Sequence, residues 1–214
     1  MSNEKCQNNS CPYRCQYGFC GIDVEGCSLE LLTEREGIIH PSAYVRSDTV
    51  IEKDVEIAEL ACVGSRGMTL RWDTNKHIHW RRKGQDYPVI LKEGAYIGAR
   101  TVIMRGTKWS TVIDENTFIG PNVSIGHDNK IGKHCCILSG TVTCGSVVIG
   151  DYSYIAPSCT IRDNITLGKG VTIGIGSLVL KDVPDGATVV GRPAQDIMLF
   201  RKERQKIKEL IRLE

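Results

Sequence analysis

Aliphatic residues recur at an interval of six along most of this chain, and no other feature of the sequence constrains its fold as strongly. Self-similarity at a fixed short period is typical of a repeat architecture. An amphipathic helix would repeat about every 3.6 residues, so an interval of six favours strands. Ile, Leu or Val fills nineteen of twenty positions in three series, with Thr143 as the exception. The series comprise Ile39, Val45, Ile51, Ile57 and Val63; Leu91, Ile97 and Ile103; and Ile113, Ile119, Ile125, Ile131, Ile137, Thr143, Ile149, Ile155, Ile161, Leu167, Ile173 and Val179.

Each hexad predicts one short strand that buries a large and a small side chain. The small residue stands two positions before the aliphatic one, as at Ala61, Thr117 and Cys135, and positions two apart share a face of a strand. Glycine often follows the aliphatic residue, as at Gly98 and Gly126, and we expect these glycines to provide the conformational freedom that a corner needs. The sequence therefore predicts an all-β fold, a coil of short strands stacked in parallel on those of neighbouring coils.

The extent of the repeat divides the chain into three segments. Residues 1–37 form a cysteine-rich N-terminal segment, residues 38–193 form the parallel β-helix with an inserted loop at 64–88, and residues 194–214 form a short C-terminal α-helix. The last segment carries an apolar stripe at helical spacing, made of Ile197, Phe200, Ile207, Leu210 and Ile211. We expect this helix to pack on the end of the coil or on a neighbouring subunit; contact with an acidic carrier protein is the alternative.

Length and charge argue against several classes of protein. A chain of 214 residues can bury its own core, and a net charge of +2 gives no strong field for nucleic acid. No apolar run reaches the length of a membrane span, and the polar first ten residues lack the apolar stretch of a signal peptide. We therefore expect a cytoplasmic protein with reduced thiols, no membrane span and no nucleic-acid partner.

The first 27 residues contain five cysteines, namely Cys6, Cys11, Cys15, Cys20 and Cys27. Thiolates bind zinc and iron clusters, but no C-x-x-C pair occurs and the spacings fit no standard metal site. Whether this segment holds a metal or free thiols stays open.

An 18-residue coil would place chemically capable residues along one edge. Residues 18 apart then lie at the same corner of successive coils, about 4.8 Å from each other. His127, Gly145, Asp163 and Lys181 form one such column, and Arg105 precedes His127 once a four-residue insertion within RGTKWS is allowed for. The larger insertion leaves the coil at this same corner, and loops beside a rigid scaffold often carry binding residues. A histidine there can take a proton from an attacking amine or hydroxyl.

The inserted loop at 64–88 has six Arg or Lys residues against two Asp. Its composition suits an anionic, ring-bearing ligand, because guanidinium groups bind phosphate and indole rings offer a stacking face. Packing of the loop against a neighbouring subunit, with its charges in water, is the alternative. The candidate substrate-binding residues of this loop are Trp72, His77, His79, Trp80 and Arg81.

Two runs of this sequence, TFIGPNVSIGHDNKIGKHC and VTIGIGSLVLKDVPDGATVVGRPAQDI, resemble hexapeptide-repeat acyltransferases, and the resemblance extends over roughly residues 38–197. The run RTVIMRGTKWSTVIDENTFIGPNVSIGHD is similar to the UDP-acylglucosamine N-acyltransferases of lipid A synthesis, and GHDNKIG also fits the nucleotide-aminosugar acetyltransferases. The resemblance implies a left-handed β-helix with three hexads per coil, assembled as a homotrimer with active sites between subunits. It further implies transfer of an acyl group, such as acetyl, from acetyl-CoA or an acyl-carrier-protein thioester to an amino or hydroxyl group of a sugar or nucleotide sugar.

The same resemblance suggests roles for the residues of the edge. His127 is the expected general base, Asp128 the residue that orients its imidazole, and Gly145 the source of a backbone amide for the oxyanion. Lys181, about 14 Å from His127 by strand spacing, and Arg192 are candidates for the phosphates of the donor. Asp163 lies on the same donor side of the edge, and Arg105 is a candidate for substrate binding.

Two other functions remain open on the sequence. A zinc carbonic anhydrase can be built on the same coil, but it needs three histidines that converge between subunits. The chain has five histidines, and His127 and His134 lack the H-x-x-x-x-H spacing expected of such a site. A non-catalytic scaffold would use the hexads for structure alone, and the two insertions beside His127 argue against it.

Overall fold

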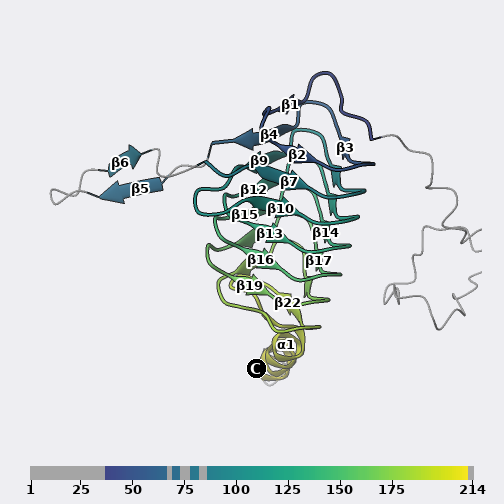
Figure 1. The fold of residues 1–214 in the computed structure, drawn as a ribbon. Coiled ribbons are helices and arrows are strands. Elements are labelled where there is room, and N and C mark those ends of the chain that lie inside the picture. Colours follow the sequence, from purple (N-terminus) through teal and green to yellow (C-terminus); the bar gives the residue numbers. More distant parts are fainter. Residues whose placement is uncertain (1–36, 67–68, 73–77, 82–85, 212–214) are drawn as a thin grey trace, which may run out of the picture. The chain divides into compact units, whose positions relative to one another are not determined.

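The computed structural model describes residues 37–66, 69–72, 78–81 and 86–211, with the backbone alone for 69–72 and 78–81. These residues belong to one compact unit. Its coils stack one on the next, and Figure 1 shows their short strands aligned in columns. The stacking produces three sheets in which the strands of successive coils pair in parallel, and the chain visits each sheet once in every coil.

The three sheets are named here after the strands of one coil. The β12 sheet contains β1 (Tyr44–Val45), β4 (Cys62–Ser65), β9 (Val102–Met104), β12 (Ser124–Ile125), β15 (Val142–Thr143), β18 (Thr160–Ile161) and β21 (Leu178–Val179). The β13 sheet contains β2 (Val50–Ile51), β7 (Val89–Leu91), β10 (Thr111–Ile113), β13 (Lys130–Ile131), β16 (Val148–Ile149) and β19 (Thr166–Leu167). The β14 sheet contains β3 (Glu56–Ile57), β8 (Tyr96–Ile97), β11 (Phe118–Ile119), β14 (Cys136–Ile137), β17 (Tyr154–Ile155), β20 (Thr172–Ile173), β22 (Thr188–Val190) and β23 (Gln195–Asp196).

The residues of the six-residue repeat pair with each other from coil to coil, as the interval predicted. Ile125 is the partner of Thr143, 18 positions later, and the same step joins most neighbouring strands. The step from Ile103 to Ile125 is four residues longer, and the step from Val63 to Ile103 is longer still, because each spans an insertion. The larger insertion contains an antiparallel hairpin of β5 (Thr69–Trp72) and β6 (Ile78–Arg81).

The repeat positions form the core. Ile103, Ile125 and Ile161 have no exposed surface, and each such burial stabilises the fold by about 1.5–3 kcal/mol. Thr143, which breaks the aliphatic rule, is buried in the same column, and its hydroxyl lies 3.4 Å from the Gly126 N–H. The small inward residue Cys135 is buried too, and this burial raises the pKa of its thiol to about 11.

The glycines that follow the aliphatic residues have a different role from the one that the sequence suggested. Gly98 and Gly126 do not adopt a positive φ. A Cβ atom at Gly126 would instead collide with the carbonyl of Cys144 in the next coil, so glycine is required by close approach of two backbones. The left-handed conformations fall mostly on residues later in each corner, which include Asn116, Asn122, Asp128, His134, Ser146 and Asn164. Asn and Asp tolerate this conformation better than most residues, which explains their frequency there.

The C-terminal helix α1 extends over Ile197–Ile211 and follows the antiparallel pair of β22 and β23. Asp196 caps it, because its Oδ1 accepts hydrogen bonds from the N–H groups of Met198 and Leu199 at 2.8 and 3.2 Å. Ile207 and Ile211 of the predicted stripe are exposed in the single chain. No helix in the described ranges has the length and apolar character needed to cross a membrane.

Candidate active site

The corner between the β12 and β13 sheets holds the column of residues that the 18-residue spacing predicted. The strand register places Arg105, His127 and Gly145 two positions after Ile103, Ile125 and Thr143, the buried partners of three successive coils. Asp163 and Lys181 follow in the next two coils. The stacking of this column is therefore as predicted from the sequence.

The imidazole of His127 lies directly against Gly145. A Cβ atom at position 145 would be 2.5 Å from Cε1 and 2.7 Å from Nε2 of the ring. Such distances are too short for any side chain, so only glycine leaves room for the imidazole in this place. The ring keeps 22% of its side-chain surface exposed, and none of the described residues accepts a hydrogen bond from the Gly145 N–H. A partly open imidazole and a free backbone amide thus lie side by side.

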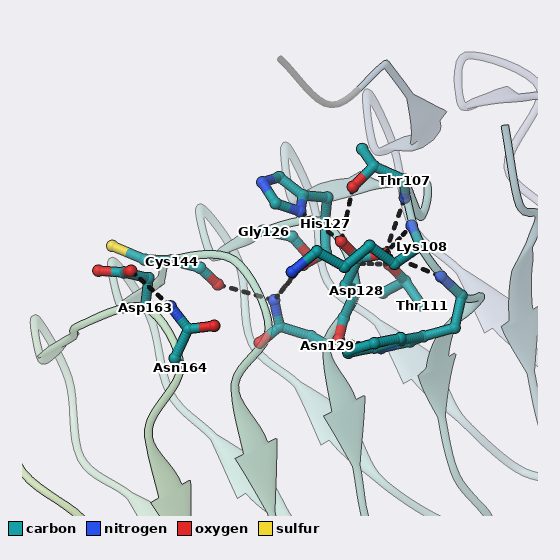
Figure 2. Close-up of polar contacts among 11 residues, drawn as sticks. Thr107, Lys108, Thr111, Gly126, His127, Asp128, Asn129, Cys144, Asp163 and Asn164 are labelled. Carbon is teal, nitrogen blue, oxygen red and sulfur yellow. Dashed lines mark hydrogen bonds and ion pairs between the residues drawn. The ribbon is translucent and has the colours of Figure 1, made fainter. Parts of the chain in front are cut away.

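Asp128 holds the other side of the imidazole. Its Oδ2 lies 2.8 Å from His127 Nδ1, and the carboxylate side chain is completely buried (Figure 2). A charged carboxylate only accepts hydrogen bonds, so Nδ1 must carry the proton of this pair. The lone pair of the neutral ring is then on Nε2, an atom that a Cβ at Gly145 would approach to 2.7 Å. The geometry sets the tautomer that a general base needs.

The four-residue insertion wraps around the carboxylate of Asp128. Its Oδ1 accepts hydrogen bonds from three consecutive backbone N–H groups, those of Thr107, Lys108 and Trp109, at 2.7, 2.8 and 3.1 Å. The hydroxyl of Thr107 donates to Oδ2 at 2.7 Å. A row of backbone amides of this kind forms a nest for an anion. Figure 2 shows Thr107 and Lys108 gathered around Asp128.

These donors decide the charge of Asp128. Burial alone would raise the pKa of the carboxyl group, but the hydrogen bonds from Lys108, Thr107, His127 and Trp109 outweigh burial and hold the pKa well below its ordinary value. The carboxylate is therefore ionised throughout the neutral pH range. The sequence placed the insertion at this corner but gave no sign that its backbone would enclose the residue after His127.

The lowered pKa of Asp128 predicts a pH-dependent contribution to stability. The contribution is present in full above the unfolded pKa of about 3.9 and is lost as the pH falls towards the folded pKa. Asp128→Asn, which keeps the shape but removes the charge, should lower the free energy of unfolding by about 1.5–3 kcal/mol at pH 7. Thermal unfolding of both proteins from pH 7 to pH 3 should show the difference in Tm narrowing below about pH 4. A difference that is constant over this range would contradict the charged state assigned to Asp128.

Asn129 ties the corner to the next coil and was not identified from the sequence. Its amide nitrogen donates to the carbonyl oxygens of Gly126 and Cys144, both at 2.7 Å, and lies 3.3 Å from that of His127 (Figure 2). The side chain is fully buried. Because these carbonyls belong to the backbone on both sides of the imidazole, Asn129 fixes the spacing between His127 and the coil of Gly145.

The side chain of Arg105 is buried at this corner rather than exposed along the edge. Only 3% of its side chain is exposed, and Nη2 lies 3.2 Å from Asp86 and 3.5 Å from Asp48. The backbone N–H of Arg105 donates to the carbonyl of Ser65 at 2.8 Å. Arg105 therefore connects both ends of the larger insertion, near Ser65 and Asp86. Its Nε and Nη1 have no hydrogen-bond partner within the described residues. The contact between Arg105 and substrate stays a prediction.

The remaining predicted residues are scattered around the coil. Asp163 and Lys181 are exposed on the His127 edge, and Asp163 accepts a hydrogen bond from Asn164 at 2.7 Å. Arg192 is at a different corner, between the β14 and β12 sheets, where its Nε donates to the carbonyl of Gly176 at 2.6 Å. Trp72, His79, Trp80 and Arg81 are on β5 and β6, where the backbone alone is described, and His77 lies outside the described residues, as do the five N-terminal cysteines.

The described part of the chain contains no cluster of three His, Cys, Asp or Glu side chains that could bind a metal ion. His134 occupies the corner after β13, where its ring stacks on Tyr152 at 5.2 Å. It therefore lies at a different corner from His127 in the same chain.

Comparison with known proteins identifies the repeat and its relatives. Residues 110–145 match the family described as bacterial transferase hexapeptide (six repeats). UDP-3-O-acylglucosamine N-acyltransferase of Caulobacter sp. (strain K31) is 34% identical over 115 residues, which cover 54% of this chain and 34% of that protein. A probable mitochondrial UDP-3-O-acylglucosamine N-acyltransferase 2 of Arabidopsis thaliana is 35% identical over 143 residues, which cover 66% of this chain and 46% of that protein.

The chain spans less than half the length of these two curated relatives. Among solved structures, the UDP-N-acetylglucosamine acyltransferase of Francisella novicida has a TM-score of 0.61 at 21% identity, with 81% of this chain and 78% of that chain covered. This likeness is one of fold. The chain is a left-handed β-helix of the hexapeptide-repeat type, similar in sequence to the UDP-3-O-acylglucosamine N-acyltransferases.

Proposed function

We propose that this protein transfers an acyl group, such as acetyl, from a coenzyme A or acyl-carrier-protein thioester to an amino or hydroxyl group of a nucleotide sugar. One observation carries the proposal: the His127 imidazole is held at Nδ1 by an ionised carboxylate and packs against Gly145, whose N–H has no acceptor among the described residues. Acyl transfer needs a base and an oxyanion donor side by side, and this corner offers both. The similarity to acyltransferases of UDP-sugars supports the choice of acceptor.

The proposed reaction assigns one task to each of three residues. Nε2 of His127 takes the proton from the acceptor amine or hydroxyl as that atom attacks the thioester carbonyl carbon. The Gly145 N–H donates a hydrogen bond to the oxyanion of the tetrahedral intermediate. Collapse of the intermediate breaks the carbon–sulfur bond, and the imidazolium returns its proton to the departing thiolate. Asp128 keeps the ring in place and stabilises its positive charge.

The donor and the assembly belong to the same proposal. Lys181 and Asp163 lie on the His127 edge, in the two coils beyond Gly145, where they would face the phosphates and pantetheine arm of the donor. Arg192 is at another corner, so it could share a site with His127 only through a second copy of the chain. A cytoplasmic homotrimer with sites between subunits would meet this requirement. The side chains of Trp72, His77, His79, Trp80 and Arg81 would then contact the acceptor from the inserted loop.

A product assay tests the proposal directly. The full chain is incubated with acetyl-CoA, longer acyl-CoA or acyl-carrier protein and a panel of UDP-amino sugars and UDP-sugars, and products are read by mass spectrometry. We expect one acceptor to gain the mass of one acyl group, with release of free thiol in equal amount. Reactions without donor control for contaminants. If folded protein acylates none of these acceptors and calorimetry finds no thioester binding, the acyltransferase function is wrong and a scaffold role is favoured.

A further inference from the structure

Trp109 is an exposed aromatic residue whose position is nevertheless fixed. Its side chain is on the insertion that encloses Asp128, and 41% of the residue's surface is exposed. The indole Nε1 donates a hydrogen bond to the backbone oxygen of Asp128 at 2.8 Å, and the Trp109 N–H donates to the carboxylate of the same residue. The ring and the backbone of Trp109 therefore each donate one hydrogen bond to Asp128, the residue that contacts His127. A fixed and exposed indole face can stack on a planar ligand with little loss of entropy.

Two lysines approach this ring without a carboxylate partner. The Nζ atoms of Lys108 and Lys130 lie 5.6 and 5.7 Å from the centroid of the Trp109 ring, within the range of cation–π contacts. Neither forms an ion pair with any described residue. Four other lysines of the coil do form such pairs, namely Lys53, Lys92, Lys133 and Lys169. The two ammonium groups beside Trp109 are thus without an ion-pair partner among the described residues, and cation–π contacts at an exposed site are weak enough to yield to an anion.

We infer that Trp109, Lys108 and Lys130 form a subsite for a nucleoside diphosphate, with the base stacked on the indole and the two ammonium groups at the phosphates. Base stacking on aromatic side chains and phosphate contact by lysine are both common in nucleotide recognition. The inference rests on the proposed function and extends it by naming where the nucleotide part of the acceptor binds.

Two substrates of the proposed reaction contain a nucleoside diphosphate, and the position of Trp109 selects between them. In a nucleotide sugar the diphosphate is separated from the acylated group by one sugar ring. In coenzyme A the whole pantetheine arm separates the diphosphate from the thioester. Trp109 is connected to His127 through the single residue Asp128, so the shorter separation fits. The nucleotide of the acceptor is therefore the proposed occupant, and coenzyme A is the competing one.

Equilibrium binding tests this subsite without turnover. UDP and, separately, coenzyme A are titrated into the full chain by calorimetry. The variants are Lys108→Gln, Lys130→Gln, both together, and Trp109→Leu, with Lys133→Gln as the matched control because Lys133 pairs with Glu115 at another corner. We expect each single lysine variant and Trp109→Leu to weaken UDP binding by about tenfold and the double variant by about a hundredfold. Lys133→Gln should bind UDP like the wild type, and coenzyme A binding should change less than twofold throughout.

Several outcomes would overturn the inference. Wild-type protein that does not bind UDP, or a double variant with wild-type affinity, removes the subsite. A selective loss of coenzyme A binding would assign the three residues to the donor. An altered oligomeric state in Trp109→Leu with unchanged UDP affinity would assign the ring to a subunit contact. None of these results touches the product assay, so the acyltransferase proposal and the subsite fail separately.

Discussion

His127→Gln should reduce kcat/KM for acyl transfer by a factor of about 10²–10⁴, the usual contribution of a general base. Glutamine fills the corner but has no lone pair basic enough to take a proton from the acceptor. The fold should survive, because the imidazole is partly exposed and Asp128 retains its four hydrogen bonds from the insertion. The measurement is initial rate against acceptor concentration at saturating donor, with Tm recorded for the same samples.

A second histidine provides the matched control for this prediction. His134→Gln removes an imidazole of the same coil at a different corner, where the ring stacks on Tyr152. We expect this variant to keep kcat/KM within about twofold of the wild type, since it leaves His127 and Gly145 unchanged. If His127→Gln retains wild-type kcat/KM with a verified acceptor, His127 is not the base and the proposed site is wrong.

Gly145→Ala should be the second most damaging change, and for two reasons. Its new Cβ would lie 2.5 Å from Cε1 of His127, so the imidazole must leave its position against Gly145. Alanine keeps the backbone N–H at this position, so the loss of activity comes from displacement of the base, whose contribution to the rate is about 10²–10⁴. Overpacking of this kind also costs roughly 1–3 kcal/mol of stability. We therefore expect a large loss of kcat together with a lower Tm.

A double variant separates the contact from a general effect of alanine on the backbone. In the His127→Ala background the ring is absent, so Gly145→Ala should lower Tm much less than it does in the wild type. The two substitutions are thus expected to be non-additive in stability, as residues in contact usually are. Additive Tm changes, or full activity of Gly145→Ala alone, would contradict the packing of the imidazole against Gly145.

The interval of six predicted the stacked parallel coil, and the resemblance to hexapeptide-repeat acyltransferases added the three hexads per coil that define the column at the corner. Once three hexads close a coil, His127, Gly145 and Lys181 must lie along one edge, because strand pairing leaves no other register. The contact between His127 and Asp128 also involves adjacent residues in a motif that the sequence displays. These features depend on the repeat or on adjacent residues, and both can be recognised in a single sequence.

The sequence was a poor guide wherever an insertion folds back on the coil. The amides of Thr107, Lys108 and Trp109 surround Asp128 because of a loop conformation for which no periodicity exists. Arg105 occupies the register position of an edge residue, yet its side chain turns inward to Asp86 at the end of the larger insertion. The glycine after Ile125 follows the pattern of a flexible corner, whereas the close approach of the Cys144 backbone is what requires it. Each of these features depends on contacts between segments that are far apart in the sequence.

The hydrogen bonds that hold Asp128 also decide which residues of this corner can be substituted. Three of the four donors that the insertion supplies to the carboxylate are main-chain amides, and any amino acid except proline provides the same group. The side chains of Lys108 and Trp109 can therefore be exchanged by mutation without releasing the residue that orients the imidazole. In this loop the backbone holds Asp128, while the side chains of Lys108 and Trp109 are free to change for a new acceptor.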